Sequence, residues 1–112
     1  MMKRFSAITK YVRISPRKAR LAAGLIKGLT AQEAKRQLEY SGLKGGRLLI
    51  KTLQSAVANA ESQGEARREK LIVDEVRVDE GPRLKRSKPR SRGSQHPFLK
   101  RMSHFTVVVV EA

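Results

Sequence analysis

Residues 71–110 read LIVDEVRVDEGPRLKRSKPRSRGSQHPFLKRMSHFTVVVV, and this stretch decides the fold. Two runs rich in β-branched residues, 71–78 and 105–110, predict strands. Between them, residues 83–101 carry eight Lys or Arg and no acidic residue. A disordered basic tail would sit at a terminus, whereas this segment leaves one strand and returns into another. We therefore interpret it as the outer part of a long hairpin.

The charge of this segment indicates a nucleic-acid partner. The chain has 112 residues, a formal net charge of +15 at pH 7 and a sequence pI of about 11.2. Nucleic-acid phosphates supply the dense negative charge that Lys and Arg neutralise. A solvated charge run without a partner is the alternative, but a one-signed, internal run set between strands favours binding.

The residues before this stretch predict one extended segment and a first helix. Residues 5–14 are β-branched and aromatic at intervals, which is typical of a strand. Ser15 and Pro16 then start a helix, because serine caps free amides and the fixed φ of proline suits the first turn. At helical spacing, the buried stripe of that helix is expected to be Ala22, Leu25, Ile26 and Leu29.

Two further helices are predicted before the first long strand. Thr30 and Glu33 form a capping-box sequence, and the helix they begin would end near Tyr40. Gly45 and Gly46 mark the boundary of a longer helix, and residues 61–69 are expected to connect it to the strand. The expected buried stripe of the longer helix is Leu49, Leu53, Ala56, Val57 and Ala60.

These elements predict an α+β fold, with three helices packed on a small three-stranded antiparallel sheet and a long protruding β-hairpin. We expect a single domain over residues 1–112, with a globular body of residues 1–78 and 103–112 and a basic arm of about residues 79–102. The prolines of the arm withhold ladder donors, so its tip is expected to be irregular. They are Pro82, Pro89 and Pro97.

A second basic cluster lies near the start of the chain, where no acidic residue precedes Glu33. Arg17 and Lys18 fall in the first turn of the predicted helix, where the helix dipole disfavours cations unless an anion binds. We therefore predict phosphate contacts from this cluster. Its members are Lys10, Arg13, Arg17, Lys18 and Arg20.

Catalytic and metal chemistry find no support in the sequence. The absence of cysteine excludes disulfides and thiolate metal sites, and His96 and His104 lack metal-ligand spacing. We expect no enzyme activity, no metal, no cofactor and no small-molecule substrate. No apolar run approaches the roughly 20 residues of a membrane span. The carboxylates Asp74, Glu75, Asp79 and Glu80 are interpreted as charge partners of Arg77 and Arg83.

Four ordered segments resemble the L-twenty-two family of large-subunit ribosomal proteins, in its bacterial form. They are residues 11–20 (YVRISPRKAR), 55–61 (SAVANAE), 78–86 (VDEGPRLKR) and 99–104 (LKRMSH). The resemblance implies a structural constituent of the large subunit that binds 23S-type rRNA, assists subunit assembly and lines the polypeptide exit tunnel with its hairpin. The implied partners are rRNA, neighbouring ribosomal proteins and the nascent chain, and the implied location is the cytoplasm. Residues 91–98 depart from the usual family pattern of basic and small residues.

The charge clusters and the resemblance together give a set of expected RNA-binding residues. They are Lys10, Arg13, Ser15, Arg17, Lys18, Arg20, Arg83, Lys85, Arg86, Lys88, Arg90, Arg92, Lys100, Arg101 and His104. The expected tunnel tip comprises Lys88, Pro89, Arg90, Ser91, Arg92, Gly93 and Ser94. The alternative function is an architectural, histone-like DNA-binding protein with basic β-arms, which the basic residues outside the arm disfavour. A cationic membrane-surface protein is a weaker alternative.

Overall fold

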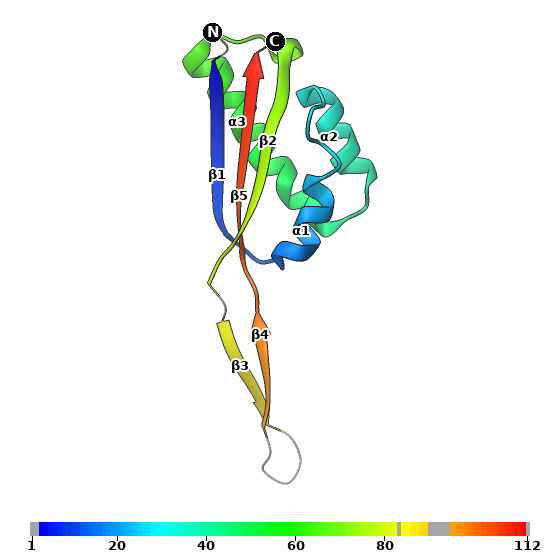
Figure 1. Cartoon of the computed structure of the whole chain (residues 1–112), viewed down its shortest axis with the longest axis vertical. Helices are drawn as coiled ribbons and strands as arrows, with labels where there is room; N and C mark the ends of the chain where they lie inside the picture. Colours follow the sequence, from blue (N-terminus) through cyan, green and yellow to red (C-terminus); the bar gives the residue numbers. More distant parts are fainter. Residues whose placement is uncertain (1–2, 83, 90–94, 112) are drawn as a thin grey trace.

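The computed structural model describes residues 3–82, 84–89 and 95–111, and it describes side chains for residues 3–82 and 101–111. Within these residues, the chain forms five strands, three α-helices and one short 3-10 turn (Figure 1). In order, they are β1 (Arg4–Val12), α1 (Pro16–Ala23), α2 (Ala31–Tyr40), α3 (Lys44–Gly64), η1 (Arg68–Lys70), β2 (Leu71–Glu80), β3 (Leu84–Pro89), β4 (Gln95–Lys100) and β5 (Ser103–Glu111).

The body is built on a three-stranded sheet of order β1-β5-β2, in which both pairings are antiparallel. The central strand β5 is buried on both of its faces. Val107 and Val109 are fully buried, and Val108, on the opposite face, is only 7% exposed. This explains why residues 105–110 show no alternation between apolar and polar residues. The predicted three-stranded antiparallel sheet is confirmed.

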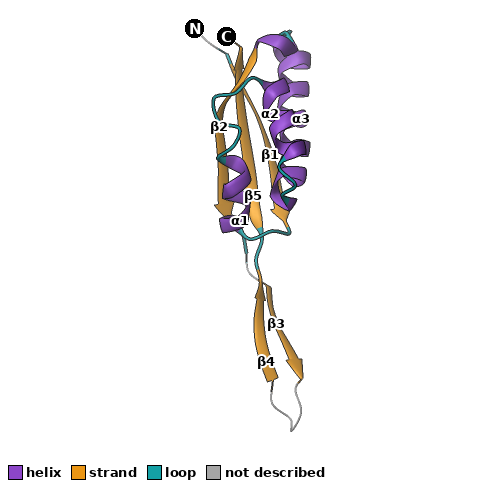
Figure 2. Ribbon diagram, turned by 90° about the vertical axis from the view of Figure 1, so that its right-hand side faces the viewer, coloured by secondary structure: helices purple, strands orange, loops and turns teal. Residues whose placement is uncertain are grey.

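The three helices cover one face of the sheet (Figure 2). Helix α3 packs on β1 and β5, while α1 and α2 pack on α3 and β2. The stripe predicted for α3 is confirmed as its buried side: Leu49, Leu53, Ala56, Val57 and Ala60. The predicted architecture of three helices on a small sheet is therefore confirmed.

The predicted helix starts are also confirmed. Ser15 is the N-cap of α1, and its Oγ accepts a hydrogen bond from the Lys18 amide at 3.4 Å. Thr30 is the N-cap of α2, and its Oγ1 accepts from the Glu33 amide at 3.3 Å. Each side chain satisfies one of the amides that a helix start leaves without an intrahelical partner.

The predicted stripe of the first helix is wrong at its end. Helix α1 stops at Ala23, and Leu25 is 43% exposed instead of buried. The chain turns after Gly24, and Gly28 at φ +86° donates its amide to the Val73 carbonyl at 2.9 Å. Pairing with the edge of β2 therefore replaces the last helical turn, although Ile26 stays fully buried.

The end of α3 also differs from the prediction. The helix continues to Gly64, so residues 61–64 belong to it and not to the connection. It ends at Glu65, which adopts the left-handed conformation at φ 53° and donates its amide to the Ala60 carbonyl. The predicted boundary missed this end because Glu, Ser and Gln are tolerated on an exposed helical surface.

The two glycines at the start of α3 have a packing role. A Cβ on Gly45 would lie 3.2 Å from the Cα of Ala19, and a Cβ on Gly46 would lie 2.9 Å from the Leu38 carbonyl oxygen. Only glycine lets α3 begin this close to both α1 and α2. The first turn of α3 is therefore held directly beside α1.

Strands β3 and β4 form a separate antiparallel ladder, from Leu84 opposite Lys100 to Pro89 opposite Gln95. This ladder extends beyond the three-stranded sheet along the longest dimension of the chain, 64 Å (Figure 1). Pro89 and Pro97 lie within the paired strands, whereas residues 90–94 of the tip, which is predicted to be irregular, lie outside the described residues. Both strands of a two-stranded ladder are edges, where a missing donor is tolerated.

The hairpin as one continuous arm, and the division into body and arm, stay predictions. Residue 83, at one junction with the body, and residues 90–94 of the expected tip lie outside the described residues.

Candidate nucleic-acid interface

The first predicted cluster gathers at one end of the body. Lys10 lies on β1, Arg13 follows that strand, and Arg17 and Lys18 lie in the first turn of α1, and all four are exposed. The sheet register places Val12 opposite Ser103, at the end where β2 stops and β5 begins. The cluster therefore adjoins the end of the sheet from which the β3–β4 ladder extends.

Two members of the predicted set have contacts inside the body. The guanidinium of Arg20 donates from Nη2 and Nε to the Val78 carbonyl oxygen, at 3.0 and 3.3 Å. This pair of bonds ties α1 to β2. Ser15 uses its Oγ as the cap of α1. Both residues therefore have a structural role, and their predicted RNA contacts stay predictions.

His104 also makes an intramolecular contact. Its Nδ1 accepts a hydrogen bond from the Tyr11 amide at 3.1 Å, and the two rings meet edge-on with centroids 5.1 Å apart. Tyr11 has a φ of 60°, at an irregularity in the pairing of β1 with β5. Because Nδ1 is the acceptor, the bond requires the neutral ring with its proton on Nε2. The geometry gives His104 a role in holding the end of β1.

The second cluster lies on the ladder, where the structure describes backbone positions only. Lys85 and Lys88 of β3 pair with Leu99 and His96 of β4. Of the basic residues expected in the arm, Arg101 is described with its side chain and is exposed. The remaining side chains lie outside the described residues: Arg83, Lys85, Arg86, Lys88, Arg90, Arg92 and Lys100. The same holds for the expected tip, which is Lys88, Pro89, Arg90, Ser91, Arg92, Gly93 and Ser94.

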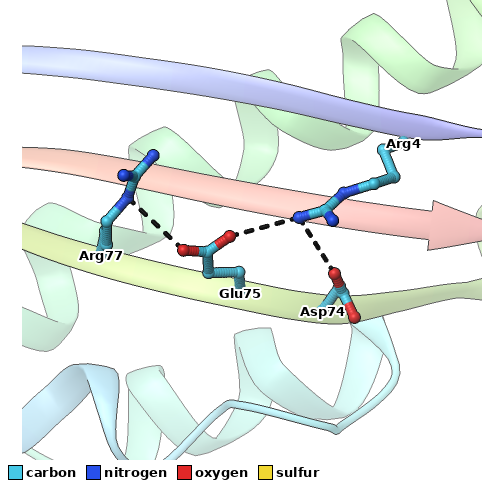
Figure 3. A network of polar contacts seen from close by, with 4 residues as sticks. All are labelled: Arg4, Asp74, Glu75 and Arg77. Carbon is cyan, nitrogen blue, oxygen red and sulfur yellow. Dashed lines mark hydrogen bonds and ion pairs between the residues drawn. The ribbon is translucent and has the colours of Figure 1, made fainter.

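Two carboxylates of β2, Asp74 and Glu75, are paired on the outer face of the sheet. Arg4 lies 3.2 Å from Asp74 and 3.2 Å from Glu75, and Arg77 lies 3.5 Å from Glu75 (Figure 3). The predicted pairing of Arg77 is confirmed for Glu75. Arg4 was missed, because β1 and β2 are distant in sequence and come together only across the central strand. The ion pairs of Asp74 and Glu75 are therefore made within the sheet, away from the cations of the predicted cluster.

Sequence reasoning also missed three cations on the first half of α3. Lys44, Arg47 and Lys51 are exposed, and they lie in a stretch, residues 40–60, that contains no acid. The missing acids were the available signal. Because α1 and α3 pack together, these cations extend the positive end of the body beyond the predicted cluster.

Similarity to known proteins identifies the family of this chain. Residues 7–110 match the model of the family described as ribosomal protein L22p/L17e. The chain belongs to this family. It is similar to the large ribosomal subunit protein uL22 of Protochlamydia amoebophila, with 70% identity over 103 residues, covering 92% of this chain and 93% of the relative. The uL22 proteins of Chlamydia pneumoniae and Chlamydia abortus are 59% and 58% identical over 107 residues, covering 96% of each chain.

Membership in the L22p/L17e family confirms the resemblance of the four sequence segments. It makes this protein a structural, non-enzymatic ribosomal protein. In the part of the chain that the structure describes, no helix is long and apolar enough to cross a membrane, and no three His or acidic residues gather into a potential metal site.

Proposed function

We propose that this protein is a structural constituent of the large ribosomal subunit that binds rRNA through the positive end of its body and through its arm. The observation that carries the proposal is the group of exposed cations where the β3–β4 ladder leaves the body, Lys10, Arg13, Arg17 and Lys18, in a stretch of sequence with no acidic residue before Glu33. Its relatives are named large ribosomal subunit protein uL22, which supports the large subunit as the assembly that contains this protein. The cytoplasm would be the location.

The mechanism would be electrostatic and geometric. Each Lys or Arg that neutralises a phosphate releases a counterion, so affinity is strong at low salt and falls as salt rises. Arginine adds a planar fork that pairs with two phosphate oxygens. Double-stranded RNA hides its base edges in a deep groove, so recognition of backbone and shape should dominate.

The arm would enter RNA and line the polypeptide exit tunnel, with the nascent chain passing its tip, and would help the subunit to assemble. Support comes from the 64 Å length of the chain and from a ladder that extends beyond the packed body. The eight basic residues between 83 and 101 would screen the like charges of the RNA segments on either side.

The salt dependence of binding tests the role of the body. We expect the double variant Arg13→Ala, Arg17→Ala to weaken binding to large-subunit rRNA and to reduce the slope of log affinity against log salt by about 2, or about 1 for each lost phosphate contact. Lys70→Ala is the matched control, because Lys70 is an exposed cation beside the start of β2, at the opposite end of the sheet. An equal loss of slope in the control would contradict the proposal.

A further inference from the structure

A small cavity of about 340 Å³ lies where α1 and α3 begin side by side. Its walls are aliphatic and come from Ile14, Leu21 and Leu43, with Gly45 between the two helices. Lys18 and Lys44 also line it. The volume is at the lower end of the range typical of small-ligand sites, about 300–1,000 Å³.

Close packing of the two helices creates this cavity. The backbone of Gly45 approaches α1 so closely that a Cβ would lie 3.2 Å from the Cα of Ala19 and 3.3 Å from Cδ1 of Ile14. The two helix starts are therefore neighbours, and the side chains of Leu21 and Leu43 border the space outside this contact. Backbone packing therefore fixes Gly45, which lines the cavity, against α1.

The apolar walls are exposed in the free protein. Leu21 is 64% exposed and Leu43 is 36% exposed, and each contributes a large apolar surface to this end of the molecule. Neither residue is needed there for the core, which α1 supplies through Ala19, Ala22 and Ala23. An apolar occupant would remove the two leucine surfaces from water.

The charges at the cavity are all positive and lack partners within the described residues. No ion pair there joins Lys18 or Lys44 to a carboxylate. Neither α1 nor α3 has an acidic residue in its first turn, and Leu43, the N-cap of α3, provides no side-chain cap. The positive helix ends and the two lysines therefore favour an anionic group at the mouth of the cavity.

We propose that this cavity takes the base of one unpaired rRNA nucleotide, whose phosphate is held by Lys18 and Lys44. The proposal rests on the rRNA-binding function proposed above. Unpaired RNA can turn a base out of its stack and place it against protein side chains. An apolar side chain of another protein would cover the leucines but leave both lysines without an anion. A nucleotide would do both, because its base would cover the leucines and its phosphate would pair with the lysines.

The variant Leu43→Asp separates the stability of the free protein from this contact. Aspartate is a preferred N-cap, and here it would also face the two lysines, so the Tm of the free protein should rise by about 4 °C or more. In large subunits, the same carboxylate would repel the phosphate. We then expect one unpaired nucleotide to become about tenfold more reactive toward base-specific probes, in keeping with the value of one stacked base.

The outcomes of this experiment are distinct. If wild-type protein protects rRNA but Leu43→Asp changes no nucleotide, the cavity proposal is overturned and the proposed function stands. If wild-type protein protects no rRNA at all, the proposed function fails first. Lys70→Ala, at the opposite end of the sheet, provides the control for cations outside the cavity, and it should leave the reactivity of that nucleotide within about twofold of wild type.

Photocrosslinking gives a second test that does not depend on the folding of Leu43→Asp. Leu21 is exposed enough to be replaced by the photoreactive p-benzoylphenylalanine without filling the core. Irradiated large subunits should give a crosslink to a single rRNA nucleotide, seen as one reverse-transcription stop. A crosslink to a ribosomal protein, or none, would overturn the proposal. The same group at Tyr40, which is 85% exposed on α2, controls for random contact.

Discussion

The guanidinium of Arg4 on β1 lies 3.2 Å from the Glu75 carboxylate on β2, so this pair spans the central strand β5 (Figure 3). The register puts Arg4 opposite Val110 and Glu75 opposite Val108. No helix covers this face of the sheet in Figure 3, yet both valines are at most 9% exposed. The charged side chains therefore shield the apolar residues of β5 from water.

The first prediction follows from this bridge. Arg4→Ala should lower the free energy of unfolding by about 1 kcal/mol, because it removes two exposed ion pairs worth about 0.2–1 kcal/mol each. The loss of Tm should shrink in 1 M salt, which screens such pairs. Arg77→Ala, which removes one contact of 3.5 Å, should cost less. Thermal unfolding followed by circular dichroism measures both, and an equal loss in the two variants would refute this account of the bridge.

The second prediction concerns the close packing at the start of α3. In Gly46→Ala, the new Cβ would lie 2.9 Å from the backbone oxygen of Leu38, so the backbone must shift. We expect a loss of about 1–3 kcal/mol, more than the helix propensity gained. Gly24→Ala is the matched control, because its Cβ would meet nothing closer than 3.5 Å. The control should be neutral or stabilising by up to about 1 kcal/mol in chemical denaturation; destabilisation by both substitutions would argue against a packing origin.

The third prediction concerns a buried hydroxyl at the start of β5. Ser103 is fully buried, and its Oγ donates to the Ile14 carbonyl oxygen at 2.7 Å, which fastens the segment before α1 to the sheet. Ser103→Ala should cost about 1–3 kcal/mol, because it leaves a buried carbonyl without its donor. Urea denaturation measures the loss. Unchanged stability would mean that the carbonyl finds another donor.

The fourth prediction is a pH dependence at the end of α3. The hydrogen bond from Arg68 Nε to Glu61, at 2.7 Å, lowers the pKa of the Glu61 carboxyl below its ordinary 4.5. A lowered folded-state pKa contributes stability that is present above the unfolded pKa and is lost as pH falls through the folded one. Glu61→Gln should therefore have a lower Tm than wild type at pH 7, and the difference should shrink as the pH falls below 4.5.

A partner variant checks this origin. Arg68→Gln removes the same hydrogen bond from its other side and should show the same pH dependence as Glu61→Gln. A difference between Glu61→Gln and wild type that persists unchanged at acid pH would show that the carboxylate charge is not responsible.

Local signals in the sequence predicted most of the fold. The side chains of Ser15 and Thr30 each accept a hydrogen bond from an amide three residues further along the chain. Both helix starts could therefore be recognised from the local sequence. The exposure of Leu25 could not, because the end of α1 depends on a backbone bond between Gly28 and Val73. Such a contact joins segments that only the finished fold brings together.

The candidate site also has one part that the local sequence predicted and another that depends on the fold. The absence of acids before Glu33 predicted the exposed cluster at Lys10 and Arg13. The lack of acids around Lys44 was visible too, but its position beside the first cluster could not be predicted, since it depends on the packing of α3 against α1. The contact of His104 with Tyr11 joins residues 93 positions apart, so no local sequence pattern could predict it.

Sedimentation of a cell lysate tests the central claim, attachment to rRNA in the large subunit, most directly. We predict that the tagged full-length protein sediments with large ribosomal subunits in untreated lysate and moves to the light fractions after ribonuclease treatment. A protein that stays in the light fractions of untreated lysate would contradict the account.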